Sequence, residues 1–183
     1  MSIITLTTDF GLKDHFAGIF KGKIYSLLPE TNIVDLSHSI DKFNVLEASY
    51  LLSVSYSHFP KGTVHIVAVD ASRNADTIHI DMLYDGHYFI GADNGVFGSL
   101  INKRNPDKIV QITIHDRLND GSSDLDVFAT VGTHLAKGGE MTIIGSPLTE
   151  IKKRNMLVPI LDQNLNSIRG HIVYIDDYWN SVT

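Results

Sequence analysis

Three apolar runs of the sequence end in an aspartate. ITLTTD ends at Asp9, VHIVAVD ends at Asp70 and HIVYID ends at Asp176, while YFIGADNG adds Asp93 and Asn94. In open α/β sheets, ligands bind beyond the carboxyl ends of strands, so carboxylates that gather there are candidate ligand-binding groups. Asp and Asn at strand ends also cap helices and close turns, and this structural role stays open for each of them.

Other common catalytic motifs are missing from the sequence or misplaced in it. The absence of cysteine excludes thiolate catalysis, disulfides and zinc–thiolate sites. DFG at 9–11 has no Gly-rich or catalytic loop before it, GADNGVFG lacks the dinucleotide-binding spacing, and no G-x-S-x-G occurs. The nine histidines form no H-E-x-x-H pair, so we expect His65 and His79, which lie in strand patterns, to be structural.

A mainly parallel sheet would bring these strand ends together. Apolar runs predict four buried strands, at 3–7, 32–36, 63–69 and 109–114. Helical spacing and breakers predict four helices, within 14–29 and near 44–57, 95–103 and 126–137. Two alternating runs around Asp85-Gly86 predict an antiparallel hairpin. The order indicates an α/β fold with a mainly parallel sheet flanked by helices.

The pattern changes toward the C-terminus. After Gly145 it consists of short strand-like pieces, in which MLVPIL and SIRGHIVYID flank a polar turn at 162–164. We therefore expect an α/β N-terminal domain over 1–160 and the start of a truncated β-rich C-terminal domain over 161–183.

Composition limits the classes of partner. The 183 residues are 43% apolar, enough for one substantial core. The net charge of −6 and the lack of a basic block argue against nucleic-acid binding. No apolar stretch reaches the roughly 18 residues of a membrane span, and no leader sequence is evident. These features predict a soluble cytoplasmic protein that is not secreted and does not bind polyanions.

Six ordered segments resemble one family. They are TTDFG, FAGIFKGKIYSLLPETNIVDLSHSI, FPKGTVHIVAVD, ADNGVFG, DVFA and IDDYWNSVT. Together they resemble the S-adenosyl-L-methionine (SAM) hydroxide adenosyltransferases, or SAM hydrolases, which are related to fluorinase and chlorinase. The resemblance implies a Rossmann-like N-terminal domain, a C-terminal β-barrel and a homotrimer with active sites between subunits. It also implies an enzyme in which water or hydroxide attacks C5′ of SAM, giving adenosine and L-methionine without a metal or cofactor.

The resemblance also implies roles for individual residues. Asp9 would bind the ribose hydroxyls, because a carboxylate has two acceptor oxygens at a fixed separation. Phe43 would pack on the nucleoside, although packing against the second helix is an equally open role. Asp176 would hold the methionine ammonium and Asn180 the adenine edge. Asn94, in ADNGVFG, is a further candidate substrate-binding residue.

The water-orienting part of the family pattern is altered. Asp70 matches the family aspartate, but Thr77 stands where an arginine is usual, and Ser123 and Leu125 replace the histidine and arginine of Phe-His-Gly-Arg-Asp. Two interpretations follow. In the first, the chain is a SAM hydrolase with Asp70 as catalytic residue and Arg73 or Ser123 as substitutes. In the second, it is a catalytically degenerate module that binds adenosine or SAM.

Overall fold

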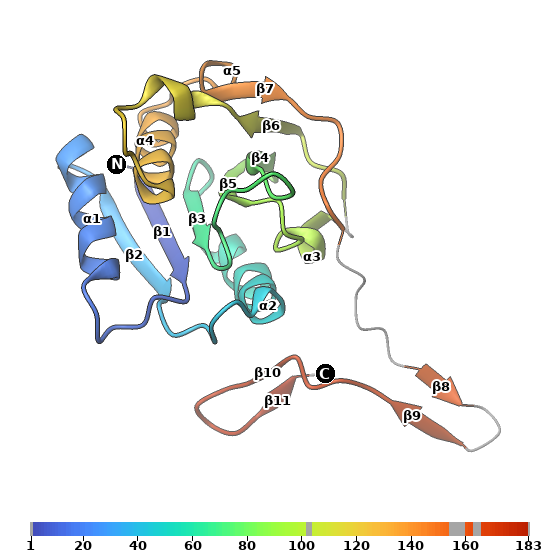
Figure 1. Cartoon of the computed structure of the whole chain (residues 1–183). Helices are drawn as coiled ribbons and strands as arrows, with labels where there is room; N and C mark the ends of the chain where they lie inside the picture. Colours follow the sequence, from blue (N-terminus) through green and yellow to red (C-terminus); the bar gives the residue numbers. More distant parts are fainter. Residues whose placement is uncertain (1, 102–103, 154–159, 163–165, 183) are drawn as a thin grey trace.

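The computed structural model describes residues 2–101, 104–153, 160–162 and 166–182. The fold is built around one seven-stranded sheet with the order β2-β1-β3-β5-β4-β6-β7 (Figure 1). The strands are β1 Ile3–Thr8, β2 Asn32–Ser37, β3 Val64–Ala68, β4 His79–Tyr84, β5 His87–Ala92, β6 Lys108–Ile112 and β7 Gly145–Pro147. β2, β1, β3 and β5 are mutually parallel, whereas β4 pairs antiparallel with both of its neighbours and β7 antiparallel with β6. The predicted α/β fold with a mainly parallel sheet is therefore confirmed.

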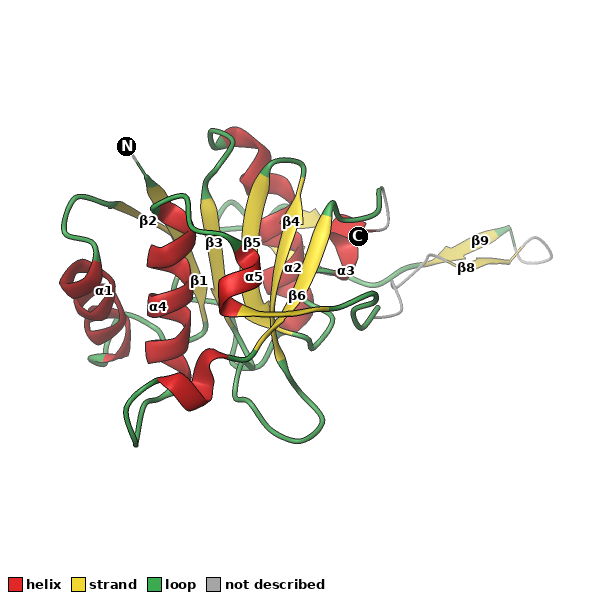
Figure 2. Cartoon of the chain, turned by 90° about the horizontal axis from the view of Figure 1, so that it is seen from above, coloured by secondary structure: helices red, strands yellow, loops and turns green. Residues whose placement is uncertain are grey.

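Helices cover both faces of this sheet (Figures 1 and 2). Those on one face are α1 Phe16–Leu27, α4 Asp124–Ala136 and α5 Met141–Ile144, and those on the other are α2 Val45–Ser55 and α3 Gly98–Ile101. Two 3₁₀ turns, η1 Tyr56–His58 and η2 Ile114–Arg117, complete the set. The apolar side chains divide into two buried clusters, one on each side of the sheet, as expected for strands that are buried on both faces.

Turn chemistry explains where the elements end. Asp85 and Gly86 both have positive φ, 49° and 73°, which is the backbone that a tight hairpin needs, so the predicted β4–β5 hairpin is confirmed. The helix predicted at 95–103 is wrong in extent, since α3 spans only Gly98–Ile101 and residues 102–103 lie outside the described part. Gly95 adopts φ 91°, a left-handed conformation that cannot belong to a right-handed helix.

Two small antiparallel hairpins follow the sheet (Figure 1). They are formed by β8 Ile160–Asp162 with β9 Ser167–Arg169, and by β10 Tyr174–Ile175 with β11 Ser181–Val182. The second hairpin contacts the α/β part through the rings of Tyr174 and Tyr50, whose centroids are 5.3 Å apart. The predicted change to short β-structure is confirmed, while a domain boundary at 160/161, which falls inside β8, remains a prediction. No described helix has the length and apolarity that a bilayer crossing requires.

Candidate functional site

A cavity of about 330 Å³ opens where β1 and β3 end and α4 begins. Three carboxylates line it, those of Asp9, Asp70 and Asp124. Its apolar part is formed mainly by four phenylalanine rings, Phe10, Phe16, Phe43 and Phe128. Because β1 and β3 are adjacent parallel strands, the aspartates that follow them meet at one edge of the sheet, as the sequence predicted.

Asp9 is held against the loop that precedes α2. Its Oδ2 accepts a hydrogen bond of 3.0 Å from the backbone amide of Phe43. Within the described residues, its Oδ1 has no protein partner and is available to a ligand. Phe43 has φ 64° and a 69% exposed ring that lines the cavity, so packing of this ring in the core beside α2 is not observed. Asp9 and Phe43 thus form one unit at the mouth of the cavity.

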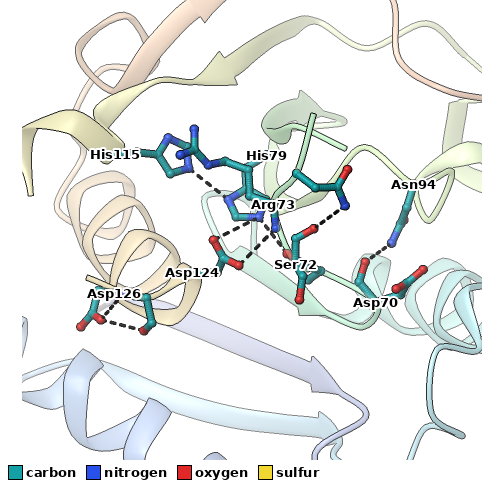
Figure 3. A network of polar contacts seen from close by, with 11 residues as sticks. Asp70, Ser72, Arg73, His79, Asn94, His115, Asp124 and Asp126 are labelled. Atoms are coloured by element: carbon teal, nitrogen blue, oxygen red, sulfur yellow. Dashed lines mark hydrogen bonds and ion pairs between the residues drawn. The ribbon is translucent and has the colours of Figure 1, made fainter. Parts of the chain in front are cut away.

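Asp70 also has a strained backbone. Its φ of 47° is unusual for a non-glycine residue, and such strain is often found at functional sites. The side chain of Asn94 stabilises this conformation, because its Nδ2 donates to the carbonyl oxygens of Asp70 and Val69 at 3.0 and 3.1 Å (Figure 3). Asn94 Oδ1 accepts from the amide of Val96, and Asn94 is not among the cavity-lining residues. In this chain Asn94 therefore supports the Asp70 loop.

The side chain of Arg73 lies outside the Asp70 cavity. Its backbone amide donates to Asp124 Oδ2 at 3.1 Å, while its side chain lines a neighbouring cavity of about 240 Å³ together with His115 and Asp116 (Figure 3). Thr77, at the position of the family arginine, exchanges backbone hydrogen bonds with Asn74 and closes the loop. Neither residue is among those that line the cavity with Asp70.

Ser123 lines the cavity but is engaged in capping α4. Both its backbone N–H and its Oγ–H donate to Asp126 Oδ2, at 2.8 and 2.7 Å. Burial alone would raise the pKa of Asp126, but hydrogen bonds from Lys23 and Ser123 lower it below its usual range. Since the hydroxyl proton already has an acceptor, Ser123 offers a ligand mainly its oxygen lone pairs.

A pair of histidines behind the Asp70 loop was not anticipated as part of a site. His79, buried in β4, donates from Nε2 to the carbonyl oxygen of Ala71 at 2.8 Å, and the same Nε2 lies 3.8 Å from Asp124 Oδ1. His115 Nε2 lies 3.2 Å from His79 Nδ1 (Figure 3). Burial lowers the pKa of His79, with partial opposition from the Ala71 carbonyl and the Asp124 charge, and burial also lowers the pKa of His115. His79 is thus not isolated, because it pairs with His115, but its hydrogen bond to the Ala71 carbonyl is compatible with the structural role expected from the sequence.

Asp124 is the functional candidate that sequence reasoning missed. The available signal was the three aspartates of DGSSDLD, at 120, 124 and 126. Asp126 has the spacing of a capping-box residue after Ser123, whereas no spacing rule singles out Asp124. What brings Asp124 to the cavity is the packing of α4 across β1, β3 and β5. That packing involves contacts distant in sequence, which one sequence does not reveal.

Asp176 and Asn180 pair with each other in the turn of the β10–β11 hairpin. Asp176 Oδ1 accepts from the amides of Tyr178 and Asn180 at 2.9 and 2.8 Å, and its Oδ2 accepts from Asn180 Nδ2 at 2.8 Å. These hydrogen bonds from Asn180 lower the pKa of Asp176. The turn presents Trp179, which is 87% exposed, and neither Asp176 nor Asn180 lines the cavity of Asp9 and Asp70 in the same chain.

Comparison with known proteins decides the family. Residues 4–145 match the model of the SAM hydroxide adenosyltransferase N-terminal domain. The chain belongs to this family. Residues 4–145 contain the sheet from Ile4 of β1 to the end of β6 and all residues that line the cavity of Asp9 and Asp70, whereas the two C-terminal hairpins lie beyond the match.

Individual relatives of this SAM hydroxide adenosyltransferase family member match nearly all of this chain but only part of their own length. An (R)-S-adenosyl-L-methionine hydrolase of Methanocaldococcus jannaschii is 29% identical over 100% of this chain and 66% of its own length. A protein of the same name from Salinispora arenicola is 23% identical over 97% of this chain and 69% of its own. A crystal structure of an uncharacterized conserved protein from Thermotoga maritima superimposes with a TM-score of 0.86 at 29% identity, covering 98% of this chain and 69% of that one. The chain thus spans about two thirds of the length of these relatives.

The residues that the sequence predicted for the site fall into two groups. Asp9 and Asp70, which match family motifs, meet in one cavity together with Phe43. Of the two expected substitutes, Arg73 lines the neighbouring cavity, and Ser123 lines the same cavity but donates its hydroxyl proton to Asp126 in the cap of α4. The described residues contain no group of three or more metal-ligating side chains that could hold a metal ion.

Proposed function

We propose that this protein hydrolyses S-adenosyl-L-methionine to adenosine and L-methionine. The observation that carries the proposal is the meeting of Asp9 and Asp70 in one cavity beside the exposed ring of Phe43. Membership of the SAM hydroxide adenosyltransferase family and the names of the M. jannaschii and Salinispora relatives support the choice of substrate.

The cavity provides groups suited to the nucleoside. Asp9 Oδ1 accepts from a ribose hydroxyl, while the Oδ2 bond to the Phe43 amide keeps the carboxylate in a fixed orientation. The phenylalanine rings give the adenosine an apolar environment, and the Phe43 ring packs against it from the mouth of the cavity. A small cavity with one apolar side and few polar groups is typical of small-molecule sites.

The reaction needs little chemical assistance. The oxygen of water forms a bond to C5′ while the C5′–S bond breaks. The electron pair of the broken bond goes to sulfur, and one proton of the water is released, giving adenosine and methionine. Because the leaving group departs from a sulfonium as a neutral thioether, it requires no general acid. Removal of bulk water favours the meeting of an electron-rich oxygen and a cationic centre. We propose that the reaction uses no metal and no cofactor, and that Asp70 accepts a hydrogen bond from the attacking water.

We further propose a homotrimer in which the β10–β11 hairpin completes the site of a neighbouring subunit. Asp176 and Asn180 lie outside the cavity of their own chain, and the turn that carries them exposes Tyr178 and Trp179. An exposed aromatic pair beside a polar turn suits contact with a partner surface. Light scattering of the purified protein at several concentrations tests this assembly.

A direct assay tests the proposed activity. Purified protein is incubated with SAM, and adenosine and methionine are quantified by chromatography. We expect both products in equal amounts, with Asp9→Ala raising KM and Asp70→Ala lowering kcat. Adenosine formation no faster than in protein-free buffer contradicts the hydrolase proposal.

The second candidate function is binding of adenosine or SAM without turnover. Two observations favour it: Arg73 lines a neighbouring cavity and not the one that contains Asp70, and the Ser123 hydroxyl donates to Asp126. Both expected substitutes are therefore placed unfavourably for water orientation. Calorimetric titration with SAM, combined with the product assay, separates the two functions. Saturable heat without product identifies a binder, whereas heat with product identifies the hydrolase.

A further inference from the structure

We propose that Asp124 orients the attacking water and accepts its proton. This inference rests on the proposed hydrolase function and deepens it by assigning the task of the missing arginine and histidine to a different residue. Asp124 is the first residue of α4 and lines both the 330 Å³ cavity that contains Asp70 and the 240 Å³ cavity next to it.

The carboxylate of Asp124 has unused acceptor capacity. Its Oδ2 accepts the amide of Arg73 at 3.1 Å, and its Oδ1 lies 3.8 Å from His79 Nε2, beyond hydrogen-bond distance. An ionised carboxylate offers about four lone-pair sites, so positions remain for a water molecule. The side chain is 36% exposed, which makes it accessible from the cavity.

Two independent contacts hold the loop from Asp70 to Arg73. Asp124 Oδ2 accepts from the amide of Arg73, and His79 Nε2 donates to the carbonyl oxygen of Ala71 (Figure 3). The loop is thereby fixed at two points, and one of them is the contact with Asp124. Such fixation keeps the carboxylates of Asp70 and Asp124 on the same cavity without rearrangement during the reaction, which is the condition for effective water orientation.

Several titratable groups surround Asp124. Asp9 and Asp70 line the same cavity, and His79 Nε2 lies 3.8 Å from Asp124 Oδ1. The neighbouring cavity is lined by Arg73, His115, Asp116 and Asp120. His79 donates Nε2–H to Ala71, so its Nε2 cannot itself accept the proton of water.

The proposed step is balanced in atoms and electrons. As the water oxygen bonds to C5′ and the C5′–S electron pair moves to sulfur, one water proton passes to the Asp124 carboxylate. Adenosine and neutral-thioether methionine result. The proton then leaves to solvent from the partly exposed carboxyl group of Asp124. A positioned general base contributes about 10²–10⁴ in rate.

The test compares Asp124→Asn with Asp120→Asn. Asparagine keeps an acceptor for the Arg73 amide but cannot take a proton, so we expect kcat for adenosine formation to fall about 100-fold or more, with calorimetric affinity for adenosine nearly unchanged. Asp120 lines only the neighbouring cavity and is exposed, so its variant controls for loss of a nearby negative charge and keeps wild-type kcat. Asp124→Ser, which also keeps an acceptor, serves as a second variant should the first not fold.

The outcomes separate this inference from the proposed function. A folded Asp124→Asn or Asp124→Ser protein with kcat near that of the wild type overturns the role of Asp124 while leaving the hydrolase intact. A wild-type protein that forms no adenosine overturns both proposals. Loss of kcat together with an equal loss of adenosine affinity assigns Asp124 to binding and also overturns the inference.

Discussion

His79 Nε2 lies 2.8 Å from the carbonyl oxygen of Ala71, so a buried histidine of β4 holds the loop that begins at Asp70. The contact joins the antiparallel part of the sheet to the carboxyl end of β3. It also fixes the tautomer of His79, because the carbonyl can only accept, and thereby leaves Nδ1 to accept from His115 Nε2.

Replacement of His79 by glutamine tests this contact. We expect a loss of stability of about 1–3 kcal/mol, because the buried polar groups lose their partners. We also expect kcat to fall about tenfold or more as the Asp70 loop loses its fixed position. Denaturant unfolding and the SAM assay measure the two effects. His171→Gln, at an exposed histidine, is the matched control, and an unchanged kcat for His79→Gln speaks against positioning by His79.

Acid should destabilise the protein through a second histidine pair. His65 is buried in β3, with Nδ1 2.7 Å from Thr5 Oγ1 and Nε2 3.2 Å from His87 Nδ1. Burial and the neighbouring His87 lower the pKa of His65 from 6.5 to about 3. The unfolded chain therefore binds more protons below pH 6.5. Between pH 6.5 and about 3, the histidine is protonated in the unfolded chain but not in the folded protein. Each pH unit of acidification in this range therefore lowers the free energy of unfolding by about 1.4 kcal/mol.

Urea denaturation between pH 7 and pH 5 measures this effect. We expect the unfolding free energy to fall with acidification and His65→Asn to flatten that dependence. His58→Asn, at an exposed histidine, should retain the wild-type slope. An unchanged slope in His65→Asn assigns the acid sensitivity to other groups.

Asp81 should have the opposite pH dependence. It is buried in β4 between Ile90 and Val110 of the neighbouring strands, and neither carboxyl oxygen has a well-formed hydrogen bond within the described residues. Burial raises the pKa of Asp81 well above its usual range, against weaker opposing effects of the Met82 amide and the Lys108 charge. Its contribution to stability is thus present below the unfolded pKa of 3.8 and is lost as the pH rises toward the folded pKa.

Asp81→Asn removes this titration with little change of shape. We expect the variant to be more stable than the wild type at pH 8, by about 1 kcal/mol or more, and to lose most of that advantage near pH 4. Thermal unfolding at both values measures the difference. Glu30→Gln, at an exposed carboxylate, controls for the change in net charge, and an equal gain at both pH values argues against a protonated Asp81.

Phe43→Ala should weaken nucleoside binding without affecting the fold. The ring is 69% exposed, so its removal creates no core cavity, but it lines the site beside Asp9. Loss of an aromatic contact costs about 1 kcal/mol, or five- to tenfold in affinity for adenosine. Calorimetry measures this, with Leu12→Ala as control, since Leu12 is 74% exposed and does not line the cavity. Equal affinity of both variants contradicts a role for the ring.

The sequence predicted features that depend on local pattern. The parallel strands and the β4–β5 hairpin follow from apolar periodicity and from Asp85-Gly86, and the position of Asp9 and Asp70 after adjacent parallel strands follows from the fold class. Helix α3 was predicted to start too early, because Gly95 has φ 91° and the right-handed helix begins only at Gly98.

By itself, the sequence determined the fold class, the family motifs and the two carboxylates that follow β1 and β3, because these depend on residue types close together along the chain. Only the tertiary structure decided how the remaining groups are used. It showed Arg73 in a neighbouring cavity, Ser123 in a helix cap, and Asp124 and His79 beside the Asp70 loop. These placements depend on how α4 and β4 pack around that loop, and such packing is set by contacts between residues about 10 to 50 positions apart, which local spacing does not encode.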